Sequence, residues 1–276
     1  MAVDPDKTVV LIHGLWVTAE SWAAFRQRFE AAGYRVLVPT WDVLNGRSAA
    51  QLNTDPPPAL GGLSIGTIVD GLAIFITAQK LKTPPLLVGH SFGGLFVQLL
   101  LDRGVGGAGV AINPAPIGGI IPGPTTLGAA LPVIFRWAGW KRVYRLTRLL
   151  FAERYANAAP AAQQNAAYDS VVIPTSGKVF YQAAFWVGTW IKARRRTQPL
   201  LITAGDADRL VTPYLSRAAY RIQKRAPART DFRLFPGRSH YLISEPGWEE
   251  VADAAIGWAA ALPVPAMRSP EPTLTM

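Results

Sequence analysis

The sequence predicts an α/β fold, in which helices cover both faces of a mainly parallel sheet. Short, almost continuously apolar segments alternate with segments whose apolar residues recur at helical spacing, and strands buried on both faces have this continuous apolar pattern. Half of the 276 residues are hydrophobic, enough to fill a large core. The alternation is interrupted once, between Asn113 and Gln198.

Six strands and five helices are expected from this pattern. The expected strands cover residues 8–14, 35–41, 85–89, 108–113, 199–205 and 230–237. The expected helices cover residues 18–32, 65–81, 92–102, 213–225 and 248–261. Thr18 is suited to cap the first helix and Gly33 to end it. Residues 45–62 are rich in Pro, Gly and Asn and are expected to form a long surface loop.

The length favours a single domain that carries an insertion. The expected core comprises residues 1–113 and 199–262, and the insertion comprises residues 114–198. Residues 263–276 have the composition of a disordered tail.

The composition excludes several classes of function. The chain has no cysteine, which excludes disulfides, thiolate catalysis and thiolate metal sites. It has three histidines, so a multi-histidine metal centre is not expected. The opening residues lack the basic and apolar segments of a signal peptide, and no apolar run is long enough to span a membrane. We therefore expect a soluble, cytoplasmic protein.

The segment GHSFG, residues 89–93, lies between an expected strand and an expected helix. Two interpretations are open. Ser91 could cap the following helix, or the segment could be a G-x-S-x-G turn that exposes Ser91 as a nucleophile above the sheet. Glycines flank the serine in such a turn because side chains there would collide with neighbouring backbone.

Four segments together resemble the α/β-hydrolase superfamily, in the order found in that family. They are His13-Gly14-Leu15-Trp16, the serine turn, Gly205-Asp206-Ala207-Asp208-Arg209-Leu210-Val211, and Gly237-Arg238-Ser239-His240. The resemblance runs from about Thr8 to Ala261 and begins at the third strand of the family. It implies a sheet of about six strands, with the insertion at the position of the family's lid or cap.

The resemblance assigns catalytic roles to three residues. Ser91 is the expected nucleophile, His240 its base, and Asp208 the carboxylate that orients the base. Asp206 competes with Asp208, but an apolar pair and a proline follow Asp208, as in the family. The other histidines, His13 and His90, are expected to be structural.

The resemblance also assigns the oxyanion hole to the backbone N–H groups of Leu15 and Phe92. Trp16 is a candidate for the wall of the acyl pocket, although a core tryptophan under the insertion is an equally good interpretation. No cofactor or metal is implied.

The insertion should select the substrate, and it contains most of the excess positive charge. The formal charge of the chain is +10, and residues 114–198 hold eleven basic residues against two acidic ones. Residues 136–151 place Trp137, Trp140 and Tyr144 on one helical stripe and basic residues on another, which predicts an amphipathic helix. Trp137, Trp140 and Trp186 are candidates for substrate contacts.

Two roles are open for this basic, tryptophan-rich insertion. It could close the active site with its aromatic side inward, or it could associate with an anionic membrane surface or admit an anionic substrate, with help from the basic residues of 191–196. No recognition motif for nucleic acid accompanies the charge.

The function predicted from the sequence is cleavage of a hydrophobic carboxylic ester through an acyl-enzyme, as in a carboxylesterase or lipase. Amidase, lactonase, thioesterase, acyltransferase and carbon–carbon bond hydrolase activities use the same triad. A cofactor-free protein of this fold that is not a hydrolase (an oxygenase or perhydrolase, a lyase or a ligand receptor) is the alternative of a different class.

Overall fold

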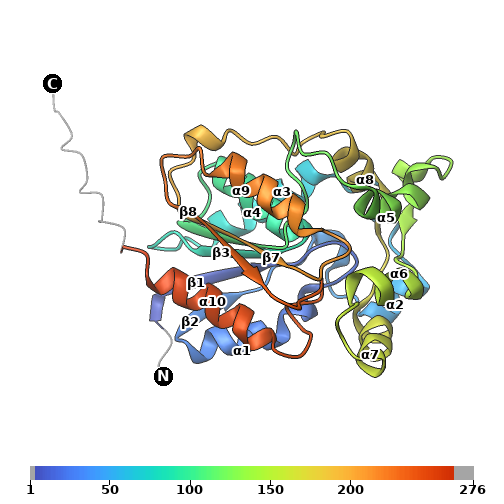
Figure 1. The fold of residues 1–276 in the computed structure, drawn as a ribbon, viewed down its shortest axis with the longest axis horizontal. Helices are drawn as coiled ribbons and strands as arrows, with labels where there is room; N and C mark the ends of the chain where they lie inside the picture. Colours follow the sequence, from blue (N-terminus) through green and yellow to red (C-terminus); the bar gives the residue numbers. More distant parts are fainter. Residues whose placement is uncertain (1–3, 264–276) are drawn as a thin grey trace.

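A sheet of six parallel strands forms the centre of the protein in a computed structural model, which describes residues 4–263 (Figure 1). The strand order is β2-β1-β3-β4-β7-β8. The strands are β1 (Asp4–Ile12), β2 (Tyr34–Leu37), β3 (Leu86–His90), β4 (Ala108–Ile112), β7 (Leu200–Gly205) and β8 (Thr230–Phe235). Because all of these strands run in one direction, their carboxyl ends lie along a single edge.

Helices cover both faces of the sheet. One face carries α1 (Ala23–Ala31) and α10 (Trp248–Ala260), and the other carries α3 (Ile65–Ala78), α4 (Phe92–Asp102) and α9 (Pro213–Gln223) (Figure 1). Shorter elements join them: η1 (Ala19–Trp22), η2 (Asp42–Leu44), α2 (Ala49–Thr54) and η3 (Pro58–Gly62).

The apolar residues of each strand serve two cores. In β1, Val9 and Leu11 pack with α1 and α10, whereas Val10 and Ile12 pack with the helices of the other face. Successive side chains of a strand point to opposite faces. A strand between two helical layers must therefore be apolar at every position, which accounts for the continuous hydrophobic runs in the sequence.

The expected α/β architecture is confirmed, with small differences at the ends of elements. The Thr18 side chain accepts a hydrogen bond from the backbone N–H of Glu20, as expected of a cap, and Gly33 ends the helical segment at a φ of 85°. The expected loop over residues 45–62 is wrong in part, because it contains α2 and η3. Ser48 and Gln51 form a capping box that starts α2. The expected disordered tail, apart from its first residue, lies outside the described residues.

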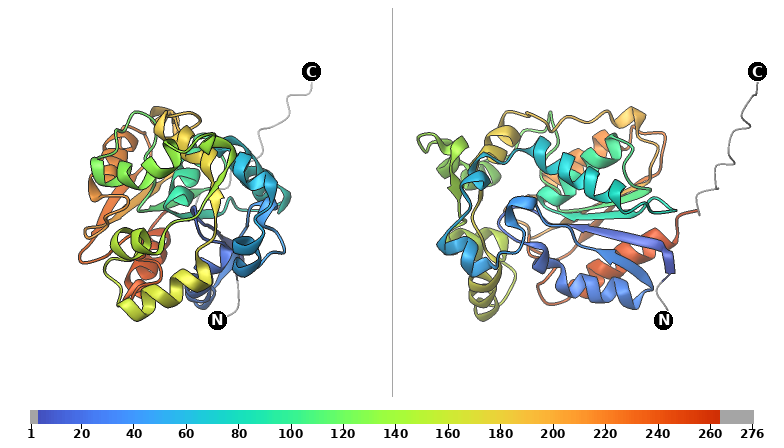
Figure 2. Two further views of the ribbon diagram at one scale, coloured as in Figure 1. Left: turned by 90° about the vertical axis from the view of Figure 1, so that its right-hand side faces the viewer. Right: turned by 180° about the vertical axis from the view of Figure 1, so that it is seen from behind.

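Residues 114–198 connect β4 to β7, its neighbour in the sheet, and most of them form a layer of short elements. In Figure 2 the layer's elements up to residue 184 lie across the carboxyl edge of the sheet, whereas residues 193–195 lie toward the opposite edge. Its elements are α5 (Pro124–Ile134), η4 (Gly139–Lys141), β5 (Val143–Tyr144), α6 (Arg148–Leu150), the π-helix η5 (Phe151–Tyr155), α7 (Ala161–Val171), β6 (Thr175–Ser176), α8 (Gly177–Ala184) and η6 (Ala193–Arg195). None of the helices in residues 4–263 is long and apolar enough to cross a membrane.

The amphipathic helix expected over residues 136–151 is wrong. The chain turns sharply at Ala138, which has a φ of 52°, and Val143 and Tyr144 instead pair with β6 in a small antiparallel ladder. Gly139 has no space for a side chain, because a Cβ there would lie 2.3 Å from the carbonyl oxygen of Val133. Local packing of the backbone therefore outweighs the helical periodicity of the side chains.

Candidate active site

The turn between β3 and α4 holds Ser91 in a strained backbone conformation. Ser91 has φ 58° and ψ −123°, a region that residues with a side chain rarely occupy. Its side chain makes no capping hydrogen bond to the helix, so the capping interpretation of this serine is wrong. The tightness of the turn explains the glycines: a Cβ at Gly89 would lie 2.2 Å from the carbonyl oxygen of Gly93, and one at Gly93 would lie 2.0 Å from that of Ile12.

The loop after β1 lies directly against this serine turn. A Cβ at Gly14 would come within 2.9 Å of the Ser91 Cβ and 3.4 Å of the Phe92 backbone nitrogen. Leu15 follows Gly14 and is buried. Phe92 is the first residue of α4, where backbone N–H groups have no acceptor within the helix and the helix dipole is positive. The two backbone segments expected to supply an oxyanion hole therefore meet beside Ser91.

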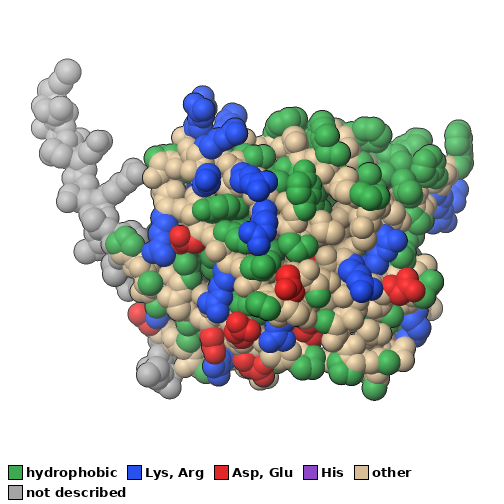
Figure 3. Space-filling model, viewed as in Figure 1, with side chains coloured by type: hydrophobic (Ala, Val, Ile, Leu, Met, Phe, Trp, Pro, Cys, Tyr) green, Lys and Arg blue, Asp and Glu red, His purple; other side chains and the backbone are tan. Residues whose placement is uncertain are grey.

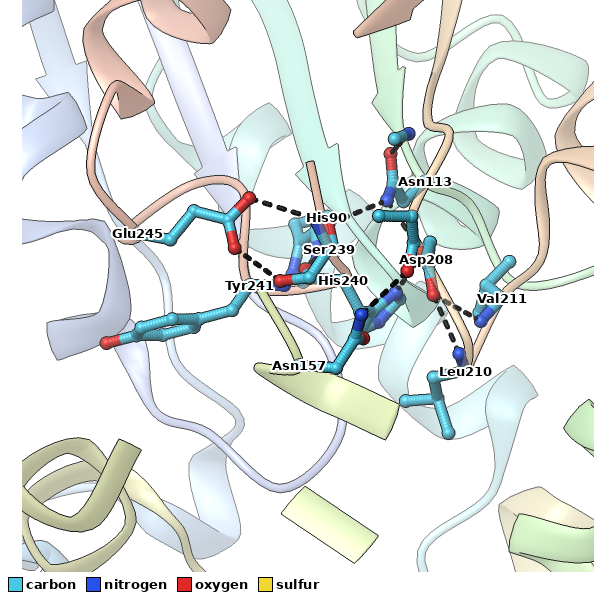
Figure 4. A network of polar contacts seen from close by, with 12 residues as sticks. His90, Asn113, Asn157, Asp208, Leu210, Val211, Ser239, His240, Tyr241 and Glu245 are labelled. Atoms are coloured by element: carbon cyan, nitrogen blue, oxygen red, sulfur yellow. Dashed lines mark hydrogen bonds and ion pairs between the residues drawn. The ribbon is translucent and has the colours of Figure 1, made fainter. Parts of the chain in front are cut away.

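The carboxylate of Asp208, in the loop after β7, is buried and receives four hydrogen bonds (Figure 4). Its Oδ1 accepts from the backbone N–H groups of Leu210 and Val211, at 2.8 Å each. Its Oδ2 accepts from Asn113 Nδ2 and from His240 Nδ1, at 2.7 Å each. Both oxygens are thus fixed, and the carboxylate holds the proton of His240 on Nδ1.

His240, in the loop after β8, is completely buried. With Nδ1 bonded to Asp208, its Nε2 remains, and this atom has no hydrogen-bond partner among the described residues. The ring packs between His90 and Tyr155, whose ring centroids lie 4.6 and 4.9 Å away. His90 Nε2 donates to the backbone carbonyl of His240 at 2.8 Å. Because His90 directly precedes Ser91, this bond joins the histidine loop to the serine turn.

A second buried carboxylate, Glu245, fixes the histidine loop from the other side (Figure 4). Glu245 accepts hydrogen bonds from the backbone N–H and the hydroxyl of Ser239, the residue before His240. The Ser239 hydroxyl oxygen in turn accepts from the Tyr241 N–H at 3.2 Å. The Glu245 carboxylate therefore holds the residue before His240 directly and the residue after it through the Ser239 hydroxyl.

An apolar pocket of about 610 Å³, including its open mouth, adjoins Ser91. One wall comes from the core and contains Trp16, Phe92, Leu210 and Val211. The other wall comes from the 114–198 layer, chiefly from α5 and α8: Thr126, Leu127, Ala130, Phe180, Ala183 and Ala184. Trp16 packs against Phe180 with ring centroids 5.1 Å apart. Such a pocket suits an apolar group attached to the atom that Ser91 would attack.

The family model described as the alpha/beta hydrolase family matches residues 9–254. The chain belongs to this family. No curated protein gives a significant match. The expected resemblance and the six-stranded hydrolase fold are both confirmed.

Solved structures similar to this hydrolase include lipases and esterases. A monoacylglycerol lipase of Paleococcus ferrophilus is 21% identical, with a TM-score of 0.67, over 94% of this chain and 95% of that one. Polyneuridine aldehyde esterase is 14% identical, with a TM-score of 0.66, over 92% and 99%. A carboxylesterase of Nitrososphaera gargenis is 17% identical, with a TM-score of 0.63, over 94% and 92%. At these identities the similarity establishes the fold.

Within the hydrolase fold, the residues expected to act together come from separate loops of one edge. The structure joins Asp208 to His240 and leaves Asp206 on the surface, where its side chain accepts from the Gly237 N–H. His13 is buried against Trp41, and burial lowers its pKa to about 4. Burial, followed by the nearby His240, lowers the pKa of His90. Both buried histidines are therefore neutral at pH 7.

The tryptophans proposed for substrate contact separate into two groups. Trp16 lines the pocket. Trp137, Trp140 and Trp186 are not among the residues that line it, and Trp137 is 84% exposed. Tyr144, expected on the same stripe as Trp137, points inward against Trp16 and Phe180.

Sequence reasoning missed Asn113, Phe180 and Glu245. Asn113 follows β4, has a φ of 43°, and bridges Asp208 to the Gly205 N–H. A polar residue directly after a buried strand could have marked it.

The described residues contain no group of three or more His, Cys, Asp or Glu side chains placed to bind a metal ion.

Proposed function

We propose that this protein is a serine hydrolase that cleaves carboxylic esters with an apolar acyl group through an acyl-enzyme. The observation that carries the proposal is the buried Asp208–His240 pair, whose free Nε2 lies in a loop bonded to the residue before Ser91. A serine is a weak nucleophile by itself and needs such an oriented base.

In the proposed reaction, Ser91 Oγ attacks the ester carbonyl carbon while His240 Nε2 takes the hydroxyl proton. The backbone N–H groups of Leu15 and Phe92 stabilise the oxyanion. The intermediate collapses by breaking the bond to the alkoxy oxygen, and His240 returns the proton to the departing alcohol. Water, activated by His240, then attacks the acyl-enzyme and releases the carboxylic acid. Asp208 holds the imidazole in the required tautomer throughout.

The pocket supports an apolar acyl group. Its walls are almost entirely aliphatic and aromatic, and Phe180 and Ala184 of α8 face the core wall across it. No charged side chain lines the pocket, so a charged group on the substrate chain would lose its hydration without gaining a partner.

The proposal is tested with a fluorophosphonate probe, which labels only activated serines. The wild-type protein should be labelled, and Ser91→Ala should not. A matched control is Ser216→Ala, which removes another buried serine hydroxyl and should leave labelling unchanged. Thermal melting of all three proteins shows whether each variant is folded.

Hydrolysis of p-nitrophenyl esters of increasing acyl length then tests the substrate class. We expect activity that depends on Ser91 and rises with acyl length until the pocket is filled. Absence of labelling in folded wild-type protein, or labelling of Ser91→Ala equal to that of the wild type, would overturn the proposal.

A further inference from the structure

The surface over α5 and α8 exposes an unusual number of large apolar side chains. Of eleven such side chains exposed in the described residues, nine lie in residues 114–198, less than a third of the chain. Eight of these nine lie on α5 or in the segments next to α5 and α8: Ile121, Leu131, Phe135, Trp137, Trp140, Phe185, Val187 and Trp190. Scattered exposed apolar residues are ordinary, but a concentrated patch indicates an interaction surface.

Basic side chains are interleaved with these aromatic ones. Arg136 lies between Phe135 and Trp137, and Lys141 and Arg142 follow Trp140; all three cations are exposed. None of them has an ion-pair partner in the part of the chain that the structure describes. Figure 3 shows blue side chains beside the green cluster over α5 and α8. We call the eight apolar residues and these three cations the aromatic-basic face.

The basic segment 191–196 does not belong to this face. The Lys192 backbone N–H bonds to Asp102 at the end of α4, and Arg196 is buried against Gln223 of α9. The sequence led us to expect that residues 191–196 would help the insertion to bind an anionic surface or substrate. Their position away from the aromatic-basic face does not fit that expectation. The charge relevant to a surface over the pocket comes from Arg136, Lys141 and Arg142.

The aromatic-basic face is built on the same two helices that form the outer wall of the pocket. Leu127 and Ala130 of α5 and Ala183 and Ala184 of α8 line the pocket, while Phe135 and Phe185 directly follow these helices and are exposed. An apolar surface, its cations and the pocket therefore lie at one end of the molecule.

We propose that the aromatic-basic face docks this protein on an anionic lipid surface. Aromatic side chains fit the boundary between headgroups and acyl chains, and the unpaired cations complement anionic headgroups. Docking there would place the lipid beside the pocket. That this helps the protein reach its substrate rests on the proposed ester hydrolysis. The docking itself does not require the reaction.

Co-sedimentation with vesicles tests the docking. The full-length Ser91→Ala variant is used beside the wild type, so that hydrolysis of lipid cannot change the vesicles. Both proteins should bind vesicles of phosphatidylcholine with phosphatidylglycerol at least about tenfold more tightly than vesicles of phosphatidylcholine alone. The difference should shrink at high salt, because ions screen surface charge.

Two sets of variants separate the apolar and the charged parts of the face. Phe135→Ser with Trp137→Ser should abolish most binding, whereas Ile74→Ser, at another exposed apolar position, on α3, should leave it unchanged. Arg136→Gln, Lys141→Gln and Arg142→Gln together should remove the preference for anionic vesicles.

A matched charge control is the triple substitution of Lys82, Lys224 and Arg225 by Gln. These exposed cations precede β3 or follow α9, and therefore lie near the amino-terminal edge of the sheet, opposite the face. They should have no effect on binding.

Three outcomes would overturn the docking proposal. The first is equal or absent binding to both kinds of vesicle. The second is undiminished binding by the folded Phe135→Ser, Trp137→Ser variant. The third is self-association, seen in sedimentation velocity and lost in that variant, which would assign the face to a second copy of the chain. Absence of probe labelling in wild-type protein that still binds vesicles would overturn the hydrolase proposal alone.

Discussion

The carboxyl edge of the sheet and the 114–198 layer form the two walls of one pocket, yet they are built differently. At the edge, the Asp208 carboxylate and the His240 Nδ1 are buried and hydrogen-bonded, and the backbone of Ser91 is held in strain. The layer consists of short elements, including a two-stranded ladder and one turn of π-helix, and it carries nine of the eleven large apolar side chains that are exposed in the described residues.

The two regions differ because proton transfer and contact with an apolar group make different physical demands on the structure. Proton transfer depends on atomic positions within a fraction of an ångström, which a rigid sheet with several anchoring hydrogen bonds provides. Contact with an apolar group or a surface depends on shape and hydrophobicity, which short elements with adaptable side chains provide. Substitutions at the edge should therefore change rate or stability strongly, and those on the outer surface of the layer should not.

Asp208→Asn should give the largest effect, a loss of about 10⁴-fold in kcat for ester hydrolysis. An amide has one acceptor atom, so it cannot accept from both backbone N–H groups and from His240 Nδ1, and the histidine loses its required tautomer. Steady-state kinetics on a p-nitrophenyl ester measure the loss.

Asp206→Asn is the matched control, two residues away in the same loop. Its carboxylate bonds only to the exposed Gly237 N–H among the contacts described, so kcat should change less than about threefold. A comparable loss in both variants would contradict the assignment of Asp208 as the orienting carboxylate.

Gly93→Ala should destabilise the fold by at least about 3 kcal/mol. The added Cβ would lie 2.0 Å from the Ile12 carbonyl oxygen, and both backbones belong to the packed sheet edge. Urea unfolding measures the change. Gly257→Ala, on the exposed side of α10 with no atom within 4 Å of the new Cβ, should stabilise the protein by up to about 1 kcal/mol. If Gly93→Ala were as stable as the wild type, the tightness of the serine turn would be refuted.

The sequence was sufficient to predict features that depend on neighbouring residues. The strands follow from local apolar runs, and the serine turn follows from the spacing of Gly89, Ser91 and Gly93 between a strand and a helix. Asp208 and His240 were assigned through the resemblance to the α/β-hydrolase superfamily, which rests on four motifs in the order of that family.

Features that depend on distant residues were not predictable in this way. The place of Asn113 directly after a buried strand could have marked it as a residue of the carboxyl edge, but not its bond to Asp208, 95 residues later. The helical spacing of Trp137, Trp140 and Tyr144 was misleading because the turn at Ala138 and the pairing of Tyr144 with Thr175 decide the backbone. Which aromatic residues face the pocket is fixed by those tertiary contacts.

Acid should destabilise the protein through the carboxyl edge, where all three histidines lie. The pKa of His13 is lowered to about 4 in the folded protein, against 6.5 in the unfolded chain, so the unfolded state binds more protons between these values. Stability is therefore fully present above pH 6.5 and falls by about 3 kcal/mol as the pH approaches 4. The lowered pKa of His90 adds to this loss.

Denaturant unfolding at pH 7 and at pH 4.5 measures this acid effect. His13→Gln removes one of the titrating groups, so the variant should lose less stability than the wild type over the same interval, whatever its stability at pH 7. An equal loss in both proteins would show that His13 does not contribute.

The smallest expected effect is at Trp137, on the outer surface of the layer, and a tryptophan buried in the core is its counterpart. Trp137→Ala should change the free energy of unfolding by less than about 0.5 kcal/mol, because this side chain is 84% exposed and little of it leaves water on folding. Trp22→Ala, at a fully buried position beside Phe25, should cost about 3–5 kcal/mol. Urea unfolding of both variants makes the comparison. A large cost at Trp137 would mean that the outer surface of the layer supports the fold, and the aromatic-basic face would then need a structural explanation in place of a lipid partner.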